Sequence, residues 1–126
     1  LAARDALLTE KRALAERVLD RVTESLEAMP DAQYLEFIAA AVERAASGGE
    51  TLAVAPADAR RLAGLVAHLA ERGVRVTPAS APASIERGVV LSGDRVRVEI
   101  SAGAIIADRR DELLLLAARE LFGGKE

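Results

Sequence analysis

The feature that most constrains the fold is a segment near the C-terminal end, from residue 86 to residue 100, in which two β-type runs flank a turn. A β-branched and apolar run at 89–91 is interrupted by Gly93-Asp94, after which charged and apolar residues alternate at a period of two. This arrangement predicts a β-hairpin whose second strand has one buried side and one solvent-facing side. The residues expected to face the core are Val96, Val98 and Ile100, and those expected to face water or a partner are Arg95, Arg97 and Glu99.

An earlier segment predicts a βαβ unit. Residues 51–55 form a short apolar run, Pro56-Ala57-Asp58 is typical of a helix start, and residues 74–77 form a second β-type run. We therefore expect a helix over 57–72 between two parallel strands that are joined by a right-handed crossover.

Three more helices are indicated. Residues 1–29 carry one apolar stripe at helical spacing, and charges of both signs occupy the other faces. Pro30-Asp31 ends this helix and begins another over 31–47, and a leucine-rich segment predicts a last helix over 103–122. The apolar stripe of the first helix consists of Leu8, Ala15, Leu19, Val22, Leu26 and Met29.

These elements predict an α+β fold with a small four-stranded mixed sheet over 51–55, 74–77, 85–91 and 95–100. Helices 31–47, 57–72 and 103–122 are expected to cover this sheet. We expect residues 1–29 to be the end of an N-terminal stalk helix and residues 30–126 to be a C-terminal globular head. Two arrangements of helix 1–29 are compatible with its pattern: it packs along the domain, or its first half continues a coiled coil. Because the helical pattern is already under way at Leu1, a longer protein is expected upstream.

Composition and motifs argue against several classes of function. The formal net charge of −3 and the 2% of aromatic residues disfavour nucleic-acid binding, and the absence of cysteine excludes thiolate metal sites. Gly48-Gly49 lacks the Lys-Ser/Thr of a phosphate loop, and His68 is the single histidine, on a helix without a catalytic set around it. No apolar run approaches the roughly 20 residues of a membrane span. We predict a non-enzymatic chain without catalytic, cofactor-binding or metal-binding residues, and no direct membrane insertion.

The C-terminal part resembles the E subunit of the A-type and V-type rotary ATPases. That family ends in a Gly-Val-Val strand, a Gly/Asp turn, an alternating strand and a helix that closes with Leu-Phe-Gly. Where the family usually carries Asp-Asn-Thr after the second strand, this chain has Glu99-Ile100-Ser101. The matching residues, in order, are Gly88-Val89-Val90-Leu91, Gly93-Asp94, Val96-Arg97-Val98 and Leu121-Phe122-Gly123.

The resemblance implies a non-catalytic peripheral-stalk subunit, or stator, that anchors the catalytic ring of an ion-translocating ATP synthase or ATPase against rotor torque. It implies a cytoplasmic location, peripheral to the membrane as part of the complex. The implied partners are a second peripheral-stalk subunit, in a coiled-coil heterodimer, and the N-terminal part of a catalytic-ring subunit. The alternative is an unrelated coil-tethered domain for protein interaction or dimerisation.

A mechanical subunit is expected to act through a protein surface, and the last helix is the best candidate for one. Four consecutive leucines at 113–116 point in four directions about 100° apart, so at least one must leave the sheet and meet the first helix or a partner. The candidate partner-binding residues are Leu8, Ala15, Arg109, Arg110, Leu114, Leu115, Leu121 and Phe122.

Overall fold

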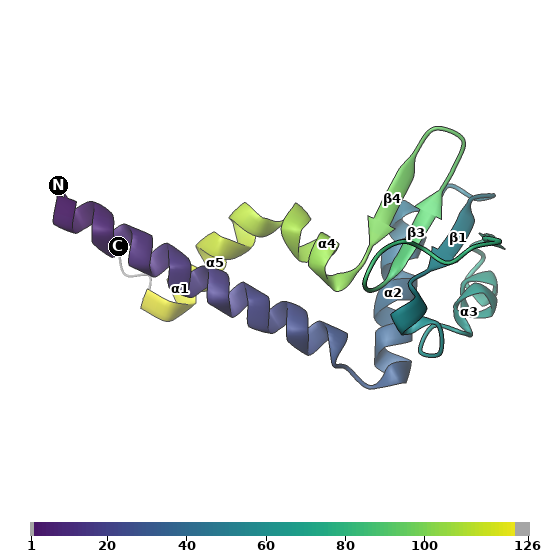
Figure 1. Ribbon diagram of the computed structural model, residues 1–126, viewed down its shortest axis with the longest axis horizontal. Coiled ribbons are helices and arrows are strands. Elements are labelled where there is room, and N and C mark those ends of the chain that lie inside the picture. The colour runs from purple at the N-terminus through teal and green to yellow at the C-terminus, as the bar shows by residue number, and fades with distance from the viewer. Residues whose placement is uncertain (1, 123–126) are drawn as a thin grey trace.

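The computed structural model describes residues 2–122 and has two parts, which lie end to end along its length (Figure 1). At one end a small sheet packs with two helices, and we call residues 29–101 the head. The other part, which we call the arm, consists of the first helix and the last two helices. The elements are α1 (Ala2–Glu27), α2 (Asp31–Ala45), β1 (Thr51–Val54), the 3-10 helix η1 (Pro56–Asp58), α3 (Leu65–Glu71), β2 (Thr77–Pro78), β3 (Val89–Ser92), β4 (Arg97–Ile100), α4 (Ala102–Asp108) and α5 (Arg110–Phe122).

The sheet has four strands in the order β2-β1-β3-β4. β1 and β2 are parallel, whereas β1/β3 and β3/β4 are antiparallel. The prediction of an α+β fold with a mixed four-stranded sheet and a long N-terminal helix is therefore confirmed, as are the parallel βαβ pairing and the hairpin. Strands β2 and β3 differ from their predicted bounds: β2 begins at Thr77 and not at residue 74, and β3 begins at Val89 and not at residue 85. In the hairpin Val89 pairs with Ile100, and Leu91 pairs with Val98.

The core of the head lies between α2, α3 and the inner side of the sheet. Its members are buried because apolar residues recur at helical spacing in the helices and fill the strand run at 89–91. Met29, at the start of the head, and Ile105, just beyond its end, pack against the margin of this core. The fully buried large side chains include Tyr34, Ile38 and Val42 from α2, Leu62, Leu65 and Leu69 from the crossover, and Val89 from β3.

One residue of the hairpin differs from the prediction. The alternation places Val96 toward the core, but this side chain is 62% exposed, whereas Ile100 is buried and Val98 packs against the core. The second strand begins at Arg97 and not at residue 95, because residues 93–96 form the turn, closed by a hydrogen bond from the Gly93 N–H to the Val96 carbonyl (2.8 Å).

The crossover is less regular than predicted. In place of one helix over 57–72, the chain forms η1, a series of turns, and then the short α3. The sequence pattern makes Asp58 a helix-starting residue, but its side chain is fully buried and its hydrogen bonds go to other segments. The first turn therefore lacks the side-chain cap that would stabilise a continuous helix, and α3 begins only after Gly64.

Only the first part of the predicted last helix packs on the head, through Ile105, and the rest does not cover the sheet. The predicted helix is divided at Arg109 into α4 and α5, and α5 runs antiparallel along α1 (Figure 1). The buried contact joins Ala15 and Leu19 of α1 to Leu114 of α5. The leucines take this direction because α2, α3 and the strands already fill the head core, to which α5 contributes no described residue. The expectation that some of the four leucines leave the sheet is confirmed.

Candidate functional site

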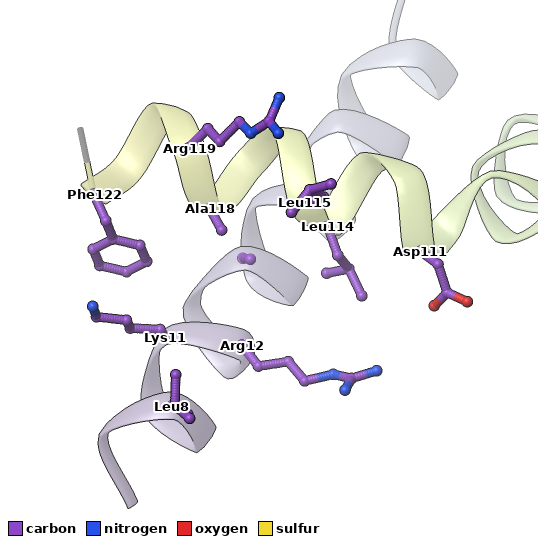
Figure 2. A pocket seen from close by; sticks show the side chains of 10 residues that line it. Leu8, Lys11, Arg12, Asp111, Leu114, Leu115, Ala118, Arg119 and Phe122 are labelled. Atoms are coloured by element: carbon purple, nitrogen blue, oxygen red, sulfur yellow. The ribbon is translucent and has the colours of Figure 1, made fainter. Parts of the chain in front are cut away.

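The two long helices of the arm form an open groove of about 540 Å³. Alanines at Ala15 and Ala118 leave room at its floor, and larger apolar side chains line its walls. Figure 2 shows the groove, with Phe122 of α5 pointing toward Lys11 of α1. The lining residues are Leu8, Lys11, Arg12, Ala15, Asp111, Leu114, Leu115, Ala118, Arg119 and Phe122.

The base of the groove is buried between the two helices, whereas its walls are exposed to solvent. Ala15 and Leu114 are buried at its base, and Lys11 Nζ lies 5.0 Å from the centre of the Phe122 ring, within the range of a cation–π contact. Yet Leu8 and Leu115 remain 55% and 57% exposed. These two leucines give the groove exposed apolar surface that a bound protein would cover.

Basic residues dominate the rim of the groove. Lys11, Arg12 and Arg119 are cationic, and the one acidic lining residue is Asp111. Arg12 forms a loose ion pair with Glu16 (3.6 Å) on its own helix. The rim therefore favours a partner that brings carboxylates beside its apolar stripe.

Five of the predicted partner-binding residues meet in this groove, namely Leu8, Ala15, Leu114, Leu115 and Phe122. The other three lie outside it. Leu121 is 41% exposed, and Arg110 pairs with Glu16 of α1 (2.7 Å), which ties α5 to α1.

Arg109 is the third residue outside the groove, and its guanidinium pairs with Glu112 one turn further along (3.0 Å). Hydrogen bonding to Arg109 and its charge hold the pKa of Glu112 below the ordinary value.

A second cluster, which the sequence analysis missed, lies where α1 enters the head. The guanidinium of Arg61 donates to the carbonyl oxygens of Glu27 and Met29, both at 2.7 Å, and its Nε donates to Asp31 Oδ1 at 3.0 Å. The same group stacks on Tyr34, with its Cζ 3.8 Å from the ring centre. One side chain thus binds the last carbonyl of α1, a carbonyl of the link that follows and the first turn of α2.

Asp58 is the buried centre of this cluster. Its Oδ2 accepts hydrogen bonds from the Tyr34 hydroxyl (2.6 Å) and the Gly88 N–H (2.7 Å), and its Oδ1 accepts one from Arg87 Nη1 (3.2 Å). Arg61 Nη1 lies 3.9 Å from the same Oδ1. We call Tyr34, Asp58, Arg61, Arg87 and Gly88 the Asp58–Arg61 cluster.

The electrostatics of the cluster favour an ionised carboxylate. Burial alone would raise the pKa of Asp58, but the hydrogen bonds from Tyr34, Gly88 and Arg87, with the charge of Arg87, outweigh it and lower this pKa. Burial, and then the bond to Asp58, raises the pKa of the Tyr34 hydroxyl, which therefore stays protonated and donating.

The sequence pattern assigned no role to Arg61 or Tyr34. The partners of Arg61 lie some thirty residues away in the chain, so no spacing rule could have paired them. The one local signal is Asp58, an acidic residue between apolar positions that the fold buries.

Little else in the described part of the chain suggests chemistry. His68 forms an ion pair or hydrogen bond with Glu36 (2.8 Å) on the surface between α2 and α3. Within residues 2–122, no group of three or more His, Cys, Asp or Glu residues is placed to hold a metal ion. No helix among these residues combines the length and the apolar character needed to cross a membrane.

Comparison with the models of known protein families and with the sequences of curated proteins finds no match to this chain.

Proposed function

We propose that this chain is the C-terminal part of a non-catalytic peripheral-stalk subunit of an A/V-type ATP synthase or ATPase, similar to the E subunit of those complexes. In this role it anchors the catalytic ring against rotor torque, on the cytoplasmic side and peripheral to the membrane. The observation that carries the proposal is the groove of the arm, in which Leu8 of α1 and Leu115 of α5 stay exposed although the two helices pack together at Ala15 and Leu114. The order and spacing of the C-terminal strand, turn and helix residues support the same assignment.

The shape of the groove suits a third helix. Two antiparallel helices with small residues at the groove floor let a further helix, about 10 Å across, approach closely. Ala15 and Ala118 are these small residues, and Leu8 and Leu115 are the walls against which its apolar stripe packs. The proposed occupant is the helix of the second stalk subunit, with an apolar stripe flanked by Glu and Asp.

Charge argues against a second copy of this chain as the occupant. Two copies joined through this face bring Lys11, Arg12 and Arg119 of each close to the same residues of the other. Like charges at close range oppose association, whereas an acidic helix relieves the repulsion. The N-terminal part of a catalytic-ring subunit, the second proposed partner, is then left to contact the head.

The test is calorimetric binding of the chain to a helical segment of the second stalk subunit. Leu115→Glu places a charge in the groove and should weaken binding by about tenfold or more. The matched control is Leu116→Glu, because Leu116 is also exposed on α5 but does not line the groove, and it should bind almost as the unmodified chain does.

Designed amphipathic peptides with one apolar stripe and either Glu or Lys flanks test the charge preference, and the Glu-flanked peptide should bind more tightly. ATP and an oligonucleotide serve as further ligands, and neither should give heat. Equal losses in Leu115→Glu and Leu116→Glu, self-association through the groove, or micromolar ATP binding would each contradict the proposal.

A further inference from the structure

Two short links join the head to the arm. Residues 28–30 connect α1 to α2, and Ser101 connects β4 to α4. Such links act as hinges unless side chains brace them, because a few residues can absorb large changes in backbone angle. Both links lie beside the Asp58–Arg61 cluster.

Arg61 braces the first link. Its fork binds the Glu27 and Met29 carbonyls, one on each side of the point where α1 ends, and also Asp31 in the first turn of α2. The last carbonyls of a helix lack partners within the helix, and a cation there also interacts favourably with the helix dipole. The Arg61 side chain is 12% exposed, so water competes weakly for these bonds.

Gly88 braces the second link. It has a φ of +87°, and a Cβ at this position would overlap the carbonyl oxygen of Ile100 and the Cα and Cβ of Ser101. The backbone before β3 therefore touches the chain where the head ends and α4 begins. The N–H of Gly88 in turn donates to Asp58 (2.7 Å).

We infer that the Asp58–Arg61 cluster locks head and arm at one fixed angle, so that the chain moves as a single rigid body. Asp58 connects the braces of the two links, through Arg61 on one side and Gly88 on the other, and the Tyr34 ring supports Arg61 by stacking. A load applied to the arm would therefore pass to the sheet through side chains and not only through the two backbone links. This inference does not depend on which partner fills the groove.

Double electron–electron resonance, which measures the distance between two spin labels, tests whether the angle between head and arm is fixed. The chain has no cysteine, so Arg17→Cys on α1 and Ala67→Cys on α3 provide two exposed labelling positions without background. With Arg61 intact we expect one narrow distance distribution. Arg61→Met keeps an unbranched side chain but removes three charge-assisted hydrogen bonds. It should therefore raise the population of other head–arm angles by about tenfold and visibly broaden the distance distribution.

Arg60→Met is the matched control, since Arg60 is exposed at the neighbouring position, and its distribution should stay narrow. If Arg61→Met fails to fold, Arg61→Lys decides, because lysine keeps the charge but cannot form the fork; melting curves establish that each variant is folded. A broad distribution in the unmodified chain, or a narrow one in a folded Arg61 variant, overturns the inference.

Discussion

Head and arm use similar apolar residues in different ways. In the head, α2, α3 and three strands surround Ile38, Leu65 and Leu69 until none of them is exposed. In the arm, the buried cluster of described residues consists of Ala15, Leu19 and Leu114, whereas other leucines on the same helices, such as Leu8 and Leu115, are exposed. The core of the head is closed, whereas the arm leaves large apolar side chains exposed. Burial therefore distinguishes the part that maintains the fold from the part to which we propose that a partner binds.

Amide hydrogen exchange should show the largest difference between the two parts. Opening of the head requires its core to unfold, whereas the first half of α1 has α5 on one side and solvent on the other. Exchange at amides of residues 8–14 should therefore be faster than in α2 and β3 by roughly a thousandfold or more. Equal protection in both regions would show that the arm is as stable as the head, and the comparison would fail.

Removing the central carboxylate should be the most damaging of the single substitutions in the head. Asp58→Ala leaves the Tyr34 hydroxyl and the Gly88 N–H without their buried acceptor and should cost about 3–5 kcal/mol. Denaturant titration measures this loss, with Asp111→Ala on the exposed rim of the groove as the control. Similar losses in the two variants would mean that the burial of Asp58 carries no special weight.

The pH dependence follows from the same carboxylate. The folded-state pKa of Asp58 lies below the unfolded value of about 3.9. The ionised carboxylate therefore adds to the free energy of unfolding above that pH, and this stabilisation is lost as the pH falls through the folded-state pKa. Glu50 acts in the same direction, since N–H groups of Ser47 and Gly48 lower its pKa. Asp58→Asn should therefore flatten the acid side of the stability curve only in part; an unchanged acid slope would contradict the assignment.

Truncating one leucine in the head and one in the arm should give the smallest of these differences in stability. Leu65→Ala empties space in a fully buried site and should cost about 3 kcal/mol. Leu115→Ala removes a side chain that is mostly exposed and should change stability by about 0.5 kcal/mol or less. Melting temperatures decide, and a loss at Leu115 comparable to that at Leu65 would mean that the groove is part of the core.

The sequence was informative where the pattern is local. The apolar run at 89–91, the Gly-Asp turn and the alternation up to Ile100 were sufficient for the hairpin, and two apolar runs around a helical segment were sufficient for the parallel pair. The pattern failed at Val96, because alternation does not show where a turn ends and a strand begins. The pattern also failed at Asp58, which it makes the start of a helix. The sequence cannot show that this carboxylate does not cap the helix and instead accepts hydrogen bonds from Tyr34 and Gly88, which are distant in the chain.

The candidate site was predicted only in part, for a related reason. Leucines at 113–116 indicated that α5 has more apolar surface than one neighbour can cover, and this was enough to select Leu114, Leu115 and Phe122. Which neighbour they meet depends on the space left by α2 and α3, and the sequence pattern carries no such information. Arg61 was missed entirely because its role comes from three segments that only the fold brings together.

The antiparallel contact of α1 and α5 has a consequence for chain entropy. It joins Ala15 to Leu114, so almost the whole described chain lies in the loop that this contact closes. Closing a long flexible loop costs conformational entropy, and the few buried residues of the arm contribute little free energy to offset this cost. Once the head has folded, however, α1 is joined to α2 through residues 28–30, and α5 is joined to β4 through α4 and Ser101, so most of the loop is already ordered. The head thus acts as an intramolecular crosslink for the arm, and a substitution that unfolds the head should separate two helices that it never touches.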